Sequence, residues 1–172
     1  MLRVNSKEIN PGDTFLSLPG EDEKKEKQIE EAIEKGAACI ITDKGQYEVK
    51  TILTPDTKTY LSNYLKELYL EKIDNIRIIG IVGTSGKTLT ENIITQLLNS
   101  LNSKTAYISD EDFYLDGKEI KTKNNIYTIY EHINKAIDNN CENIIIELST
   151  ENIIQRNFEG LRFDIVIYTN LI

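Results

Sequence analysis

The sequence predicts an α/β protein in two parts: a small N-terminal α/β domain at residues 1–72, and part of a doubly wound, mainly parallel sheet at residues 73–172. Three observations support this prediction. Residues 76–82 form a nearly continuous apolar run, which is typical of a central parallel strand covered on both faces. A glycine-rich turn follows the run, and an amphipathic helix follows the turn. A second strand-like segment then completes the strand–loop–helix–strand unit of a doubly wound sheet.

The N-terminal part contains three strand-like segments and two helical patterns. Turn residues precede the first strand, and Gly36 is the stop signal of the first helix. We expect strands at 14–18, 37–42 and 47–53 and helices at 24–35 and 56–70. The polar stretch 71–75 is the expected linker.

The second part continues with alternating strands and helices. The helix expected at 87–101 carries an apolar stripe that we expect to be buried, formed by Leu89, Ile93, Ile94, Leu97, Leu98 and Leu101. Residues 113–121 predict a hairpin that turns at Asp116-Gly117, because this dipeptide is a strong hairpin signal. Further helices are expected at 128–139 and 151–157, and further strands at 105–109, 143–148 and 164–168.

Composition excludes several classes of protein. The net charge is −8 and no basic patch stands free of acidic neighbours, so we expect no nucleic-acid partner. No apolar run approaches the roughly 20 residues of a membrane-spanning helix, and the start resembles no signal peptide. We therefore expect a cytoplasmic protein without a membrane partner. Its oligomeric state is left open.

The cysteines and the single histidine suggest no metal site. Cys39 and Cys141 lie beside apolar strand-like runs, and we expect buried free thiols. His132 is the only histidine and has no further zinc ligands arranged around it. We expect it at the surface or at a rim.

The segment 80–88, which reads Gly-Ile-Val-Gly-Thr-Ser-Gly-Lys-Thr, predicts a phosphate-binding loop. Glycines let several backbone N–H groups approach a polyphosphate, and the following helix points its positive end at the same place. Lys87 then reaches the β/γ-phosphates, and the Thr88 hydroxyl binds Mg²⁺. The segment does not match the strict P-loop pattern GxxxxGK[ST], because Ile81 occupies the position of the first glycine. The alternative is a glycine-rich turn that only joins strand to helix.

The loop resembles that of the Mur ligase family, which commonly reads Gly-Thr-Asn-Gly-Lys-Thr, and other segments agree in order and spacing with MurE-type members. These segments are 11–20 (PGDTFLSLPG), 32–37 (AIEKGA), 145–150 (IIELST) and 163–171 (FDIVIYTNL). The resemblance covers the whole chain. It implies an ATP-dependent ligase that joins an amino acid to a UDP-linked muramoyl peptide through an acyl phosphate.

The resemblance also implies roles for individual residues. Gly83, Thr84, Ser85, Gly86, Lys87 and Thr88 bind ATP, and Lys87 stabilises the transferring phosphoryl group. Thr88 binds one Mg²⁺ and Glu147 a second, since a carboxylate at the carboxyl end of a strand beside phosphates is a natural metal ligand. The alternative for Glu147 is a solvated strand-end acid. Ser6 stands where these ligases contact the uridine, and UDP-muramoyl peptide is the implied partner.

Three segments depart from the family pattern. The loop carries Ser85 for asparagine and Leu89 for a hydroxyl residue. The Thr-Thr-Pro segment that contacts the UDP-sugar corresponds to residues 124–126, which have lost both hydroxyls and the proline. The charged run 21–27 replaces an Asp-Gly-His segment.

The chain also stops where these ligases continue into a further central segment and a C-terminal domain. We expect either the N-terminal portion of such a ligase or, as the alternative, a non-catalytic nucleotide- or partner-binding module. A GTPase is a poorer third reading, because residues 134–138 are one residue too long for Asn-Lys-x-Asp and lie in a helical pattern. On either of the first two readings, we expect this chain alone to lack ligase activity.

Overall fold

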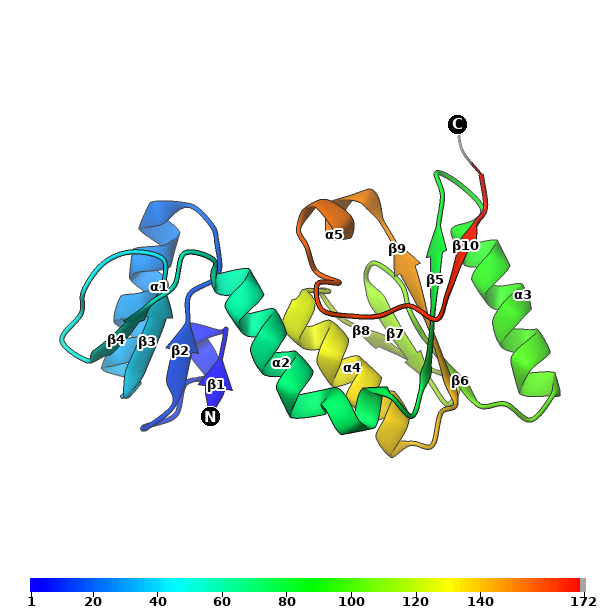
Figure 1. Cartoon of the computed structure of the whole chain (residues 1–172), viewed down its shortest axis with the longest axis horizontal. Coiled ribbons are helices and arrows are strands. Elements are labelled where there is room, and N and C mark those ends of the chain that lie inside the picture. Colours follow the sequence, from blue (N-terminus) through cyan, green and yellow to red (C-terminus); the bar gives the residue numbers. More distant parts are fainter. Residues whose placement is uncertain (171–172) are drawn as a thin grey trace. The chain divides into compact units, whose positions relative to one another are not determined.

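The computed structural model describes residues 1–170 and forms two compact units, Met1–Tyr64 and the part from Leu65 onward. Each unit contains its own sheet (Figure 1). Within the described part of the chain, no helix has the length and apolar character that crossing a membrane requires. The predicted α/β class is confirmed for both units.

The first unit contains a four-stranded, wholly parallel sheet in the order β1-β2-β3-β4. Its core includes Phe15, Ile29, Ala32 and Ile40, which join the sheet to the first helix. The elements are β1 (Leu2–Arg3), η1 (Ser6–Glu8), β2 (Thr14–Leu16), α1 (Asp22–Glu34), β3 (Cys39–Thr42) and β4 (Lys50–Leu53). The short strand β1 was not expected, because two residues are too few to show a periodic pattern.

The helix α2 (Thr57–Ile73) is longer than expected and takes in the first three residues of the expected linker 71–75. Glutamate and lysine favour a helix, so a polar composition alone did not end it. Lys72 also has partners, since its Nζ lies 3.1 Å from the Asp138 carboxylate and 2.8 Å from Asn134 Oδ1. The two compact units divide within α2, between Tyr64 and Leu65.

The second unit contains a six-stranded sheet in the order β10-β5-β9-β6-β7-β8. The central strand β5 pairs parallel with both neighbours, as a doubly wound sheet requires. The strands are β5 (Arg77–Val82), β6 (Thr105–Ile108), β7 (Asp112–Leu115), β8 (Lys118–Lys121), β9 (Asn143–Leu148) and β10 (Ile165–Tyr168), and the helices are α3 (Lys87–Ser100), α4 (Ile126–Asp138) and α5 (Thr150–Ile154).

The predicted hairpin turn is also present. β7 and β8 are antiparallel, and Asp116 and Gly117 both have positive φ angles, 53° and 73°. Two positive φ angles are what a type I′ turn needs, and Asp-Gly tolerates them well. This turn adds an antiparallel edge to an otherwise parallel sheet.

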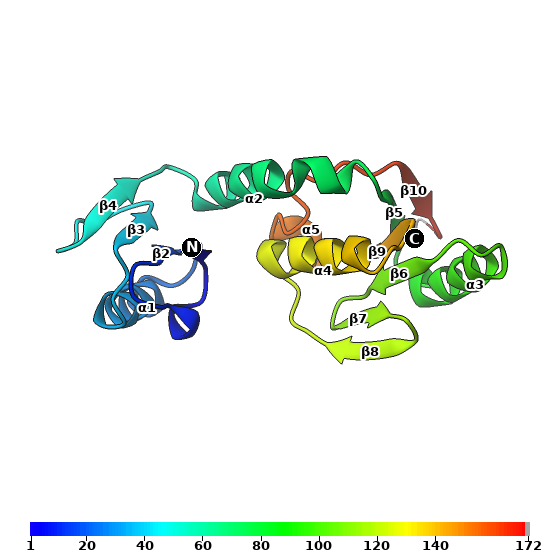
Figure 2. The same cartoon turned by 90° about the horizontal axis from the view of Figure 1, so that it is seen from below.

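Helices cover both faces of this sheet, and β5 shows the division. Ile78 packs with Ile129 and Ile133 of α4 on one face. Ile81 faces the other way and packs with Ile94 and Leu98 of α3. Figure 2 shows α3 and α4 as separate layers of this unit. A parallel strand covered on both faces reads as an apolar run, which explains the pattern at 76–82.

The expectation that the whole apolar stripe of α3 is buried was wrong. Ile94 and Leu98 pack on the sheet, but Leu89, Ile93, Leu97 and Leu101 are 58–68% exposed. The exposed four are spaced four residues apart, so they form a ridge beside the one that touches the sheet. The buried ridge instead includes Glu91. Nothing in the described chain covers the outer ridge.

His132 is buried, and the expectation of a surface position was wrong. It is 4% exposed, and its ring stacks on Phe113 with 4.4 Å between centroids. Nε2 lies 3.2 Å from the Thr122 hydroxyl, and burial lowers the pKa of His132 to about 4. Cys39 and Cys141 are buried free thiols, as predicted.

The buried histidine makes the stability of the fold depend on pH. An unfolded histidine has a pKa of about 6.5, whereas that of folded His132 is about 4. The unfolded chain therefore takes up a proton first as the pH falls from 6.5 towards 4. We predict that this lowers the free energy of unfolding by roughly 2–3 kcal/mol.

Urea denaturation at several pH values measures this loss. His132→Gln is the matched control, because a glutamine keeps a polar contact for Thr122 without titrating. A wild-type loss over this range no larger than that of His132→Gln contradicts the prediction.

Candidate functional site

The loop between β5 and α3 has the backbone form that its glycines allow. Gly83 and Gly86 have φ angles of 154° and 80°, which non-glycine residues rarely adopt. A Cβ atom on Gly83 would also collide with the Thr169 hydroxyl. Lys87 is the first residue of α3, so the loop leads directly into the positive end of a 14-residue helix. The loop lies at the carboxyl edge of the parallel sheet, where doubly wound folds bind ligands.

Two residues after β10 hold the loop in place. Asn170 Oδ1 accepts hydrogen bonds from the Thr84 backbone N–H at 3.0 Å and from the Thr84 hydroxyl at 2.8 Å. Asn170 Nδ2 donates to Ser85 Oγ at 2.7 Å, and the Thr169 hydroxyl donates to the Ser85 carbonyl at 2.7 Å. Sequence reasoning noted this segment but gave neither residue a role. The contacts span more than 80 residues, so only the sheet order reveals them.

Lys87 folds back over the loop and faces a carboxylate. Its Nζ donates to the Gly83 carbonyl at 3.0 Å and lies 3.5 Å from Glu147 Oε1. The side chains of Lys87 and Glu147 are only 16% and 11% exposed. The structure thus brings together the loop and the carboxylate that the sequence singled out. Opposite charges this close and this shielded interact more strongly than a surface pair.

Sheet register sets the position of Glu147. It is the fifth residue of β9 and lies beside Ile81 of β5, close to where β5 enters the loop. The Tyr107 hydroxyl on β6 donates to Glu147 Oε2 at 2.8 Å. Glu147 is therefore held between a cation and a hydrogen-bond donor, and the alternative of a freely solvated strand-end acid does not fit. No sequence signal pointed to Tyr107.

Thr88 is exposed on the first turn of α3 and lines a cavity of about 270 Å³ together with Glu91, Thr95, Tyr107 and Tyr114. A hydroxyl and a carboxylate oxygen, from Thr88 and Glu147, are donors that suit Mg²⁺. The described chain groups no three His, Cys, Asp or Glu side chains as a metal cage. Two protein oxygens are too few to fill the coordination shell of Mg²⁺, so a cation at this place would need further ligands from outside the described residues.

Ser6 belongs to the first unit and its hydroxyl already has a partner. The residue is 3% exposed, and Oγ donates to Glu31 Oε2 at 2.6 Å. Lys35 bonds both to the Glu31 carboxylate and to the Ser6 carbonyl. In this structure the Ser6 side chain thus joins η1 to α1.

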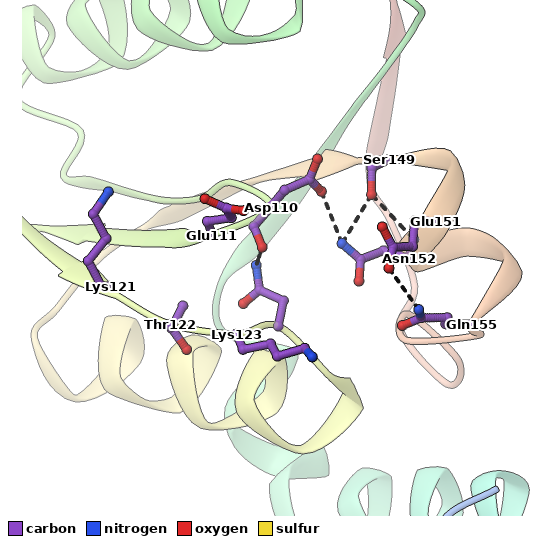
Figure 3. Close-up of a pocket in the computed structure, with 10 residues that line it drawn as sticks. Asp110, Glu111, Lys121, Thr122, Lys123, Ser149, Glu151, Asn152 and Gln155 are labelled. Atoms are coloured by element: carbon purple, nitrogen blue, oxygen red, sulfur yellow. Dashed lines mark hydrogen bonds between the residues drawn. The ribbon is translucent and has the colours of Figure 1, made fainter. Parts of the chain in front are cut away.

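A larger cavity of about 650 Å³ opens between the loops after β6 and β8 and the start of α5 (Figure 3). Asn152 is one of the lining residues, and its side chain donates to Asp110 Oδ1 at 3.0 Å and to Ser149 Oγ at 3.1 Å. The lining residues are Asp110, Glu111, Lys121, Thr122, Lys123, Asn124, Ser149, Glu151, Asn152 and Gln155. Three acids and two lysines give the wall a mixed charge.

Only one residue of the 124–126 segment lines this cavity. Asn124 does so, with its Nδ2 bonded to the Ser109 and Asp110 carbonyls. Asn125 instead caps α4 by accepting hydrogen bonds from two backbone N–H groups, and Ile126 is fully buried. The segment is therefore used largely to begin a helix.

A comparison with protein-family models matches residues 81–172 to the Mur ligase middle domain. The match begins inside β5 and covers slightly more than half of the chain.

Curated relatives carry the same family's names. A UDP-N-acetylmuramoyl-L-alanyl-D-glutamate--2,6-diaminopimelate ligase of Helicobacter pylori is 39% identical over 100 residues, covering 56% of this chain and 22% of the relative. Ligases of the same name from Aquifex aeolicus and Haemophilus ducreyi are 27% and 26% identical. Each of these two alignments covers 99% of this chain and 36% or 38% of the relative. The chain thus spans about a third of their length.

Solved structures support the fold. A structure with the same diaminopimelate ligase name superposes with a TM-score of 0.85 at 20% identity, over 99% of this chain and 36% of the other. A MurF ligase from Thermotoga maritima in complex with ADP gives a TM-score of 0.59 at 22% identity, over 98% and 37%. At these identities the likeness shows the fold alone.

Proposed function

We propose that this chain, which belongs to the Mur ligase family, is the N-terminal portion of an ATP-dependent ligase of peptidoglycan precursor synthesis. The proposed reaction joins an amino acid to a carboxyl group of a UDP-N-acetylmuramoyl peptide. The observation that carries the proposal is the glycine loop whose Lys87 faces Glu147 at the carboxyl edge of the sheet. Because the chain spans about a third of its relatives, the activity is proposed for the whole ligase.

The loop is proposed to bind the triphosphate of ATP. Glycine loops hold phosphates with backbone N–H groups and the first turn of the following helix, and residues 83–86 lead directly into α3. For the loop amides to bind a phosphate, the Thr84 and Ser85 N–H groups must leave Asn170 Oδ1. Lys87 carries the positive charge that stabilises the transferring phosphoryl group. Its contacts to Gly83 and Glu147 place that charge beside the loop before any ligand arrives.

Thr88 and Glu147 are proposed to hold Mg²⁺. The ion supplies positive charge that screens the phosphate oxygens. Because the Tyr107 hydroxyl occupies Glu147 Oε2, Lys87 and the ion must share Oε1.

The 650 Å³ cavity is proposed to receive part of the acceptor peptide, because it lies next to Ser149 at the end of β9, two residues after Glu147. Its wall offers amides and a hydroxyl from Asn124, Ser149, Asn152 and Gln155, which suit peptide groups. Ser6 is proposed to contact the uridine, for which its hydroxyl must leave Glu31.

We place the domain boundary at residue 72/73, near the end of α2, with a UDP-substrate-type domain before it and the partial middle domain after it. The family match at 81–172 supports a boundary before β5, whereas the compact units divide eight residues earlier than 72/73, between Tyr64 and Leu65. The proposed compartment is the cytoplasm, where ATP and UDP-linked precursors are made.

The exposed apolar surface supports the reading as a portion of a larger fold. The outer ridge of α3 exposes Leu89, Ile93, Leu97 and Leu101, and the edge strand β10 exposes Ile165 on the α3 face and Val166 on the other. Contiguous apolar patches on single proteins usually mark a surface that packs against something. We propose that the remainder of a Mur ligase middle domain covers it. A non-catalytic binding module stays the second candidate, because the 124–126 segment serves mainly to start α4.

We predict that Lys87→Ala weakens binding of Mg²⁺-ATP by about 10- to 100-fold, because a charged hydrogen bond is worth roughly 1.5–3 kcal/mol. Titration calorimetry on the two proteins measures this. Lys118→Ala is the matched control, since Lys118 lies on the exposed hairpin strand β8. Equal affinities of wild type and Lys87→Ala would remove the phosphate-loop assignment.

We also predict that this chain alone makes no peptide bond. Forming an acyl phosphate requires ATP, metal and acceptor carboxylate to be held in line. The phosphate loop and Glu147 supply only the triphosphate and metal side, and on the acceptor side the 124–126 segment departs from the family pattern. The test is incubation with ATP, Mg²⁺, UDP-muramoyl dipeptide and candidate amino acids, followed by detection of tripeptide product and ADP. Product above the level of a Lys87→Ala control would show that the chain is a complete catalyst.

A further inference from the structure

Four polar side chains meet in the layer between α3 and the sheet. Lys87 and Glu91 come from the helix, Tyr107 from β6 and Glu147 from β9. Tyr107 and Glu91 are 4% and 5% exposed, so both are nearly as buried as the isoleucines around them. Groups this buried stay in a fold at low cost only when they have hydrogen-bond partners. The proposed function uses Lys87 and Glu147 and leaves Tyr107 and Glu91 unexplained.

Tyr107 is fixed at both ends of its side chain. Its ring packs in the core with Ile79, Ile81 and Ile145 and stacks on Tyr114, with 5.5 Å between ring centroids. Its hydroxyl donates to Glu147 Oε2 at 2.8 Å. Because the ring is packed on its faces, the hydroxyl has little freedom to leave the carboxylate. Glu147 Oε2 is therefore held in one place.

The direction of this hydrogen bond is also fixed. Burial, and then the charge of Glu147, raises the pKa of Tyr107, so the phenol keeps its proton and donates it. Glu91 accepts a hydrogen bond from the Thr95 hydroxyl at 2.9 Å. Burial raises the pKa of Glu91, and the nearby charge of Glu147 raises it further.

We infer that Tyr107 is a positioning residue for Glu147. By holding Oε2, it turns Oε1 towards Lys87 and the phosphate loop, where a cation brought by the nucleotide can share it. This inference rests on the proposed function, because it assigns a role to a neighbour of the proposed metal ligand. Partners that orient a metal ligand affect metal affinity without touching the metal.

Tyr107→Phe tests the inference, because it removes only the hydroxyl and keeps the ring in the core. Electron paramagnetic resonance with Mn²⁺ measures cation affinity in the presence of ATP, and calorimetry in EDTA measures ATP affinity without metal. We expect Tyr107→Phe to bind Mn²⁺ about tenfold more weakly and metal-free ATP as the wild type does. Tyr114→Phe, which removes a hydroxyl from the stacked ring on the same cavity, should change neither affinity.

The outcomes separate this inference from the proposed function. Wild-type chain that binds no Mn²⁺-ATP overturns the proposed function and this inference with it. If the wild type binds Mn²⁺-ATP and Tyr107→Phe binds it with the same affinity, the inference alone is overturned. If Tyr107→Phe loses affinity equally for Mn²⁺ and for metal-free ATP, the role of Tyr107 is merely structural, and the inference is again overturned.

A second variant keeps the test valid if Tyr107→Phe folds poorly. Tyr107→Phe in a Glu147→Gln background leaves no unpaired buried carboxylate, so its folding cost is lower. Because Tyr107 acts through Glu147, we expect the double variant to bind Mn²⁺ no more weakly than Glu147→Gln. A further tenfold loss in that background would contradict the inference.

Discussion

The contact between Lys87 and Glu147 is the interaction on which the rest of the site depends. It joins the first turn of α3 to β9, and its two side chains are almost enclosed. Everything needed to form it is set by the fold: a parallel register that puts Glu147 beside β5, and a loop short enough to bring Lys87 back over the sheet edge. The same geometry leaves a positive group and one carboxylate oxygen beside the glycine loop and the N-terminus of α3. A polyphosphate with a divalent cation has the complementary charges.

The shape of the loop depends both on its own glycines and on a residue that is distant in the sequence. Gly83 and Gly86 permit its backbone angles, and Asn170, from the end of β10, fastens Thr84 and Ser85. Because β10 pairs with β5, the hydrogen bonds from Asn170 to the loop can form only when the sheet has formed. Both the local sequence and the long-range topology therefore shape the site. In the first unit, by contrast, the Ser6 hydroxyl is already engaged in a hydrogen bond to Glu31 within the same unit.

Sequence predicted what depends on local pattern. The run at 76–82, the glycine loop and the Asp116-Gly117 turn each have a strong local cause, and the structure contains all three. The outer ridge of α3 was misjudged because periodicity shows that a stripe is apolar but not what covers it. His132 and Tyr107 were missed for a related reason. The hydrogen-bond partner of His132 is 10 residues away and that of Tyr107 is 40 residues away, and no spacing rule connects either pair.

The most direct test of the account is a nuclear magnetic resonance titration of ¹⁵N-labelled chain with Mg²⁺-ATP. The backbone signals of Gly83 to Thr88 should move first and furthest, and those of Asn170 should follow because its side chain bonds to the loop. Signals of the first unit, such as Phe15 and Ile40, should stay in place. A titration that leaves 83–88 unmoved while signals elsewhere shift would contradict the central claim that this loop is a nucleotide site.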